Sequence, residues 1–143
     1  MSPIETVERR SPRPRVAIAL ALLGAAAVAL PTAPKAEPRG LEGSWSGGGV
    51  VQLPSGQQER ARCRARYSRA SRTTYVVNAV CATPSGRAAQ TANLLRTGAN
   101  SYAGSFYNAE YGISGSIYVT VRGNSQRVTL TSAAGSASLR LSR

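Results

Sequence analysis

The stretch that decides the fold is Glu-Arg-Ala-Arg-Cys-Arg-Ala-Arg-Tyr, residues 59–67. Every second residue in it is an arginine, at Arg60, Arg62, Arg64 and Arg66. The residues between the arginines are small or apolar, namely Ala61, Cys63, Ala65 and Tyr67. A period of two is that of a β-strand with one buried face and one solvated face. The stretch therefore predicts a half-buried strand with arginines outside and a cysteine inside.

Similar alternating stretches recur from Leu41 onward, with turn residues between them and no helical periodicity. We expect strands at about 43–53, 59–67, 73–82, 87–96, 101–110 and 113–122, and two more around 128–130 and 137–141. Short strands at this spacing favour an all-β domain built as an antiparallel meander of about eight strands. A small up-and-down barrel would remove the exposed edges of such a meander. A two-sheet sandwich is the alternative architecture.

Small residues fall repeatedly on the faces that we expect to be buried. Gly47-Gly48-Gly49 in the first strand indicates a bulge or a close approach of two backbones. Ala61, Ala65, Ala79, Gly104 and Gly115 would likewise allow tight curvature or a modest cavity.

The N-terminal region has the order of segments found in a secretory signal peptide. Basic residues between Arg9 and Arg15 precede an uncharged run of Ala, Leu and Val at 16–30, and prolines follow. We expect cleavage after Ala29 or Ala36, which leaves a single β domain at 37–143 and places the protein in the periplasm or outside the cell. The run is shorter than the roughly twenty residues of a membrane span, which favours a cleaved signal peptide. Retention as a membrane anchor is the alternative.

The sequence contains two cysteines, Cys63 and Cys81, and cysteines of an exported chain are expected to pair. A disulfide closing a loop of this length stabilises a small domain by roughly 3 kcal/mol. If the two cysteines face each other, residues whose numbers sum to 144 are partners. Ala65 then meets Ala79 on the inner face, and Arg62 meets Ala82 on the outer face.

The chain is strongly basic, with 18 Lys and Arg against 6 Asp and Glu and a formal net charge of +12. Lys35 is the only lysine, so codon usage in a GC-rich genome is one explanation for the arginines. An anionic partner such as an envelope polysaccharide or a lipid headgroup is the other. Nucleic acid is a poorer candidate, because an exported protein rarely meets it and only Tyr67 in the arginine stretch could stack on bases.

The residue types argue against an enzyme. The sequence has no histidine and no aspartate, which removes Ser-His-Asp and Cys-His catalysis and the usual zinc and calcium ligand sets. Glu59 and Glu110 are two glutamates in a strand-rich chain, where such residues are usually solvated. We therefore expect no catalytic residues, no metal and no cofactor.

The arginine stretch does not require a ligand to exist. Residues two apart on a strand lie about 6.7 Å from each other. In water each adjacent pair of arginines then repels by about 0.6 kcal/mol, which gives roughly 1–2 kcal/mol for Arg60, Arg62, Arg64 and Arg66 together. A disulfide-linked strand tolerates this cost. A solvated face and an anion-binding face are both compatible with the pattern.

Most of the chain beyond Leu41 resembles a family of uncharacterised exported proteins of Gram-negative bacteria. The resemblance rests on the segments 43–49 (Gly-Ser-Trp-Ser-Gly-Gly-Gly), 62–65 with Tyr67, 81–82, 104–106 and 122–126. It implies export and a β-rich fold with one disulfide, and it implies no activity.

Gly43-Ser44-Trp45 also resembles the Gly-x-Trp of calycin barrels, the lipocalin and avidin type. In those families a basic residue near the last strand packs across the tryptophan, and the resemblance makes Arg140 the candidate for that role here. The Erwinia-type metalloprotease inhibitors are exported barrels with one disulfide and a similar opening.

Two hypotheses about function follow. The first is an exported, non-enzymatic β-barrel that binds an anionic envelope component through Arg60, Arg62, Arg64 and Arg66. The second is a calycin-like barrel that holds a small apolar ligand inside or inhibits a protease.

Overall fold

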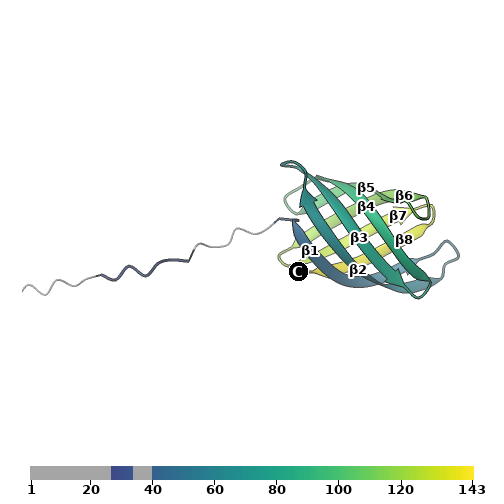
Figure 1. Ribbon diagram of the computed structural model, residues 1–143, viewed down its shortest axis with the longest axis horizontal. Helices are drawn as coiled ribbons and strands as arrows, with labels where there is room; N and C mark the ends of the chain where they lie inside the picture. The colour runs from purple at the N-terminus through teal and green to yellow at the C-terminus, as the bar shows by residue number, and fades with distance from the viewer. Residues whose placement is uncertain (1–26, 34–39) are drawn as a thin grey trace, which may run out of the picture. The chain divides into compact units, whose positions relative to one another are not determined.

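The computed structural model describes residues 27–33 and 40–143, and the latter form a closed antiparallel barrel of eight strands (Figure 1). The strands are β1 (Gly43–Gln52), β2 (Gln58–Arg69), β3 (Thr74–Thr83), β4 (Gly86–Arg96), β5 (Ser101–Asn108), β6 (Ile113–Arg122), β7 (Ser125–Ser132) and β8 (Gly135–Ser142). Each strand pairs with the next, and β8 returns to pair with β1. The predicted up-and-down barrel is confirmed, and the sandwich is not formed.

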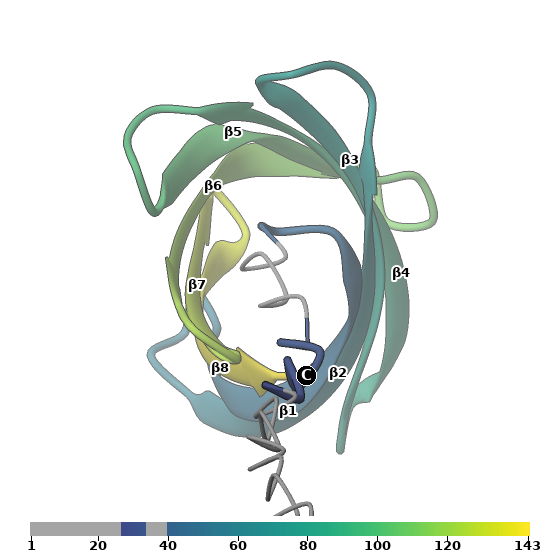
Figure 2. The ribbon, with the colours of Figure 1, turned by 90° about the vertical axis from the view of Figure 1, so that its left-hand side faces the viewer.

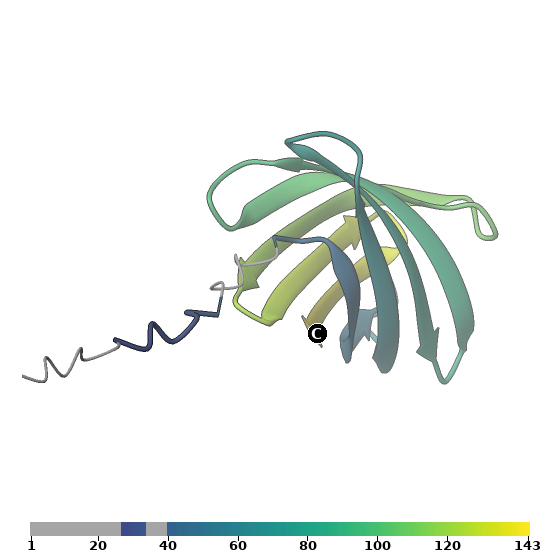
Figure 3. The same ribbon diagram turned by 60° about the vertical axis from the view of Figure 1, so that its left-hand side comes forward.

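β1 is the strand that closes the barrel, because it pairs along its length with β2 and also with β8. Figure 2 looks nearly along the barrel axis and shows the strands following one another around the ring. Figure 3 shows the hairpin turns gathered at the two ends. Every strand has two neighbours, so most of the sheet has no exposed edge, as closure was expected to bring. Residues 58–61 of β2 and 86–90 of β4 pair on one side only.

β2 has the alternation predicted from its arginines. Its burial changes at each residue from Arg60 to Tyr67, with the arginines exposed and the residues between them buried. The register with β3 also matches the prediction, since Cys63 lies opposite Cys81, Ala65 opposite Ala79 and Arg62 opposite Ala82. The two cysteines form a disulfide across this strand pair, with their Cα atoms 4.1 Å apart.

The glycines of β1 mark a close approach of backbones, which was one of the two predicted explanations. β1 keeps an unbroken register with both neighbours through Gly47, Gly48 and Gly49, so it has no bulge there. A Cβ atom at Gly47 would collide with the carbonyl oxygen of Arg140, and one at Gly49 with that of Ser138. The strand can therefore lie this close to β8 only where side chains are absent.

The barrel interior is filled by side chains that differ between the two ends. The end where β1 begins holds large buried groups, among them Trp45, Tyr67, Tyr75 and Tyr102. Aliphatic side chains such as Val119, Val128 and Leu139 fill the middle, and each contributes about 1.5–3 kcal/mol by leaving water. The opposite end is lined by small groups, including Ala61, Ala137 and the disulfide.

The predicted signal peptide lies largely outside the described residues, which begin at 27 and omit 34–39. Residues 27–33 have no regular secondary structure. The cleavage sites and the boundary of the domain at 37 therefore remain predictions. Across the described ranges, no helix has the length and hydropathy needed to cross a membrane.

The disulfide generates a first testable prediction. Cys63→Ala together with Cys81→Ala should lower the free energy of unfolding by about 3 kcal/mol, because the unfolded chain regains the entropy of an open loop. Urea denaturation of the variant and of the parent protein, the latter with and without reductant, measures the change. If reduction leaves the midpoint of the parent protein where it was, the stabilising role of the disulfide is refuted.

Candidate functional site

Trp45 closes the aromatic end of the barrel with a partner that the sequence analysis did not name. Its indole Nε1 donates a hydrogen bond to the carbonyl of Leu41 at 3.0 Å. The guanidinium carbon of Arg143 lies 4.4 Å from the centre of a Trp45 ring, and Arg143 Nη1 donates to the carbonyls of Gly40 at 2.7 Å and Glu42 at 3.0 Å. Arg143 thus ties the last residue of the chain to the segment that enters β1.

The expected pairing of Trp45 with Arg140 is wrong. Arg140 lies opposite Gly48 in β1 and opposite Arg127 in β7, and its side chain is exposed on the outer surface. Alternation along β8 places Leu139 and Leu141 inside and Arg140 outside. The basic residue that packs on Trp45 comes instead from just beyond the strand, where alternation no longer decides its direction.

A second buried contact at the same end joins β2 to β7. The Tyr67 hydroxyl donates to Gln126 Oε1 at 3.0 Å, and burial raises the pKa of Tyr67 well above its usual range. Gln126 is itself 2% exposed, and its Nε2 has no hydrogen-bond partner among the described residues. Tyr75 and Tyr102 pack edge to face beside this pair, with ring centres 5.3 Å apart.

The interior has little free space. Between the disulfide, Phe106, Ile117 and the surrounding aliphatic side chains lies one cavity of about 30 Å³. That is the volume of about one liquid water molecule, whereas sites for small organic ligands usually measure about 300–1,000 Å³. The core as it stands has no room for such a ligand.

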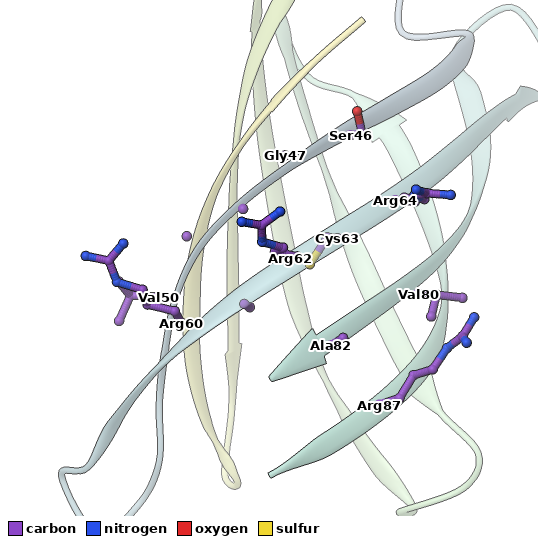
Figure 4. Close-up of a pocket in the computed structure, with 13 residues that line it drawn as sticks. Ser46, Gly47, Val50, Arg60, Arg62, Cys63, Arg64, Val80, Ala82 and Arg87 are labelled. Atoms are coloured by element: carbon purple, nitrogen blue, oxygen red, sulfur yellow. The ribbon is translucent and has the colours of Figure 1, made fainter. Parts of the chain in front are cut away.

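The outer surface carries the predicted arginine strand and a broad hollow over it. Arg60, Arg62 and Arg64 project from β2, and Figure 4 shows them with Arg87 of β4 around this hollow. The hollow has a volume of about 1040 Å³. Its floor is made of small residues, Gly48 in β1 and Ala82 in β3, so the arginines stand above their surroundings. Arg66, the remaining member of the predicted set, borders the next hollow along β2.

The register extends this surface beyond β2 to arginines that the sequence analysis did not connect with it. Arg140 of β8 pairs with Gly48, Gly48 with Arg62, Arg62 with Ala82, and Ala82 with Arg87 of β4. In the other direction Arg140 lies directly opposite Arg127 of β7. We call the outward arginines of these strands the basic face: Arg60, Arg62, Arg64, Arg66, Arg87, Arg127 and Arg140.

Among the described residues, no carboxylate forms an ion pair with the basic face. The six strands from β7 through β8 and β1 to β4 are fully described, and their only acidic residue is Glu59. Glu59 instead accepts a hydrogen bond from the Ser85 hydroxyl, which lowers its pKa. Within residues 27–33 and 40–143, none of the seven arginines forms an ion pair, whereas Arg69 at the barrel end pairs with Glu42 at 3.3 Å.

The chemistry available on this face is the binding of anions. A guanidinium group offers several N–H donors in a planar fork that fits a carboxylate or phosphate. Over the described part of the chain, no three or more His, Cys, Asp or Glu side chains gather into a metal site. Glu110 lies in the turn between β5 and β6.

No family model matches the sequence, and a search of curated proteins finds no match. Solved structures do resemble the fold. The redesigned β-barrel mFAP1 bound to DFHBI is similar with a TM-score of 0.61 at 13% identity, over 72% of this chain and 94% of that one. A fluorescence-activating β-barrel designed de novo has a TM-score of 0.58 at 14% identity, over 74% and 95% of the two chains. At such identities the likeness shows the barrel fold alone.

The contact of Arg143 with Trp45 generates a second prediction. Arg143→Gln should lower the free energy of unfolding by about 1–2 kcal/mol, because it removes a cation–π contact and two hydrogen bonds from a charged donor. Arg140→Gln is the matched control and should not lower stability, because Arg140 is exposed and lies opposite another arginine, Arg127. Urea unfolding can be followed by the fluorescence of Trp45, the only tryptophan. Equal losses in the two variants would contradict this assignment.

The buried Tyr67 phenol generates a third prediction. Below pH 10, its ordinary pKa, the phenol is protonated in both the folded and the unfolded chain. Above that pH the unfolded chain releases the proton first, since the pKa of Tyr67 is raised in the folded state, so stability should fall. The slope for one such group approaches about 1.4 kcal/mol per pH unit.

Urea unfolding at pH 8 and pH 11 measures this effect. Tyr67→Phe should be less stable than the parent at pH 8, because it loses the hydrogen bond to Gln126, and should lose less stability between the two pH values. The same loss in both proteins would show that other groups govern the alkaline transition.

Proposed function

We propose that this protein is an exported, non-enzymatic binding protein that holds an anionic partner on its basic face. The observation that carries the proposal is the gathering of Arg60, Arg62, Arg64 and Arg87 around one hollow floored by Gly48 and Ala82. Arg140 and Arg127 follow along the register row of Arg62 and Arg87. Arginines placed for solubility alone need not converge on one hollow, and nearby acidic residues would normally balance them.

Export is part of the proposal and has support of its own. The Cys63–Cys81 disulfide suits an oxidising compartment, because cytosolic thiols are kept reduced. The basic and apolar order of the N-terminal region agrees with it.

The outer surface is better supported as the binding site than the interior. mFAP1 is a barrel of similar fold in complex with DFHBI, yet the cavity of the present barrel measures about 30 Å³. Protease inhibition by the N-terminal segment would involve residues 34–39, which lie outside the described residues. No observation on the described part of the chain favours it.

A fourth prediction tests whether binding to anions depends on the basic face or only on the net charge of the protein. Arg62→Gln with Arg64→Gln should weaken binding to an anionic matrix, because each exposed ion pair contributes about 0.2–1 kcal/mol and two together correspond to roughly fivefold in affinity. Elution from a carboxylate resin in a salt gradient measures this, and the loss should be greatest at low ionic strength.

The matched control is Arg72→Gln with Arg96→Gln, which removes the same charge from the ends of the barrel. Arg72 lies in the turn after β2, and Arg96 bonds the carbonyls of the next turn. Circular dichroism checks that both variants fold. If the two variants elute at the same salt concentration, retention reflects net charge alone and the proposed function is wrong.

A further inference from the structure

The basic face is curved, and the curvature bears on the shape of its partner. One register row runs from Arg127 through Arg140, Gly48, Arg62 and Ala82 to Arg87. The row makes five steps between neighbouring strands, from β7 to β4, in a barrel of eight strands. At about 4.8 Å per step it is roughly 24 Å long. Because barrel strands tilt by about 35–45° from the axis, the row also runs along the barrel and covers roughly a third of its circumference.

A flat surface touches a cylinder along one side only. A lipid bilayer in contact with Arg62, near the middle of the row, therefore lies farther from Arg127 and Arg87 at its ends. A flexible chain that carries repeated negative charges can follow the curve and meet all of these arginines together. The arrangement therefore favours a linear polymer over a membrane surface.

On the β7, β8 and β1 side of the basic face, the residues between the arginines are mainly hydroxyl side chains, whereas Val80, Ala82 and Ala89 lie on the β3 and β4 side. The row beside the central one contains Ser125, Ser142 and Ser46 before it reaches Arg64. The row on the other side contains Thr129 and Ser138, followed by Val50 and Arg60. A hydroxyl group both donates and accepts hydrogen bonds, so these side chains suit a partner that is rich in hydroxyl groups as well as charged.

Aromatic side chains are missing from the outer side of the same strands. The six described strands from β7 to β4 contain three aromatic residues, Trp45, Tyr67 and Tyr75, and all three are buried in the barrel. Proteins that bind single-stranded nucleic acid usually stack its bases on exposed aromatic rings. This face offers charge and hydroxyl groups without such rings.

We propose that the partner is a linear acidic polysaccharide that lies across the strands along the row from Arg127 to Arg87. The inference rests on the proposed function, since it names the partner of the same basic face. The arginines bind the carboxylates of the polymer, and the flanking serines and threonines bind its sugar hydroxyls. Because several arginines act together, affinity depends on the length of the polymer.

Titration calorimetry with polygalacturonate fragments of increasing length tests this arrangement. Affinity should rise with length until a fragment covers the row and should then level off. Arg87→Gln with Arg127→Gln removes the two ends of the row and should weaken binding of long fragments about fivefold while leaving the shortest fragment unaffected. Arg62→Gln with Arg64→Gln removes the centre and should weaken binding of every fragment.

The hydroxyl side chains are tested with a second polymer. Ser46→Ala with Ser142→Ala should weaken binding of polygalacturonate severalfold and leave binding of polyphosphate, which carries no sugar, unchanged. If the serine variant binds both polymers as tightly as the parent does, the polysaccharide arrangement is wrong. It is also wrong if the Arg87 and Arg127 variant and the Arg62 and Arg64 variant lose the same affinity for fragments of every length.

A third arm separates this inference from the proposed function. Binding to phosphatidylglycerol vesicles or to oligothymidylate that depends on Arg62 and Arg64, without binding to polygalacturonate, would overturn the polysaccharide and leave an anion-binding face. Should the Arg62 and Arg64 variant bind every one of these anions as tightly as the parent does, the inference and the proposed function both fall.

Discussion

The structure depends on the pairing of β1 along both of its edges. Besides pairing with β2, β1 runs close against the backbone of β8. Cβ atoms at Gly47 and Gly49 would collide with carbonyl oxygens of β8, so this second pairing requires glycine at both positions. The glycines lower the intrinsic preference of the segment for a strand. Pairing on both edges offsets this, because it closes the barrel and gives every strand two neighbours.

Closure divides the molecule into a filled interior and a charged exterior. Alternation sends Ala61, Cys63 and Tyr67 inside and the arginines of β2 outside, and the disulfide fixes this register against β3. Because the interior retains a cavity of only about 30 Å³, the proposed binding site lies on the outer surface. Gly48 also shapes the outer surface, because a Cβ atom there would collide with the carbonyl oxygen of Ala61 in β2, and together with Ala82 it forms the floor of the outer hollow.

Features that depend on neighbours in the chain could be predicted from the sequence, and features that depend on closure could not. The faces of β2 and its register with β3 followed from the arginine period and from the two cysteines. Arg140 and Arg127 join the basic face only through the pairing of β8 with β1 and β7, which alternation within one strand does not specify. Arg143 was missed for another reason. It follows the last strand, and its direction is set by the carbonyls of Gly40 and Glu42.

The pair of Arg127 and Arg140 sets two like charges side by side on the basic face. Directly opposed residues of antiparallel strands have Cα atoms about 5 Å apart. Two unit charges at that distance repel by about 0.8 kcal/mol in water, and this is an upper bound because the long side chains can point away from each other. The neighbouring outward positions hold Ser138, Ser142 and Thr129, so no adjacent carboxylate lowers this repulsion. An anion that lies between the two guanidinium groups would be attracted by both of them. The repulsion between the two arginines is the same before and after binding, so the attraction of such an anion to the pair is the sum of its attractions to the two arginines.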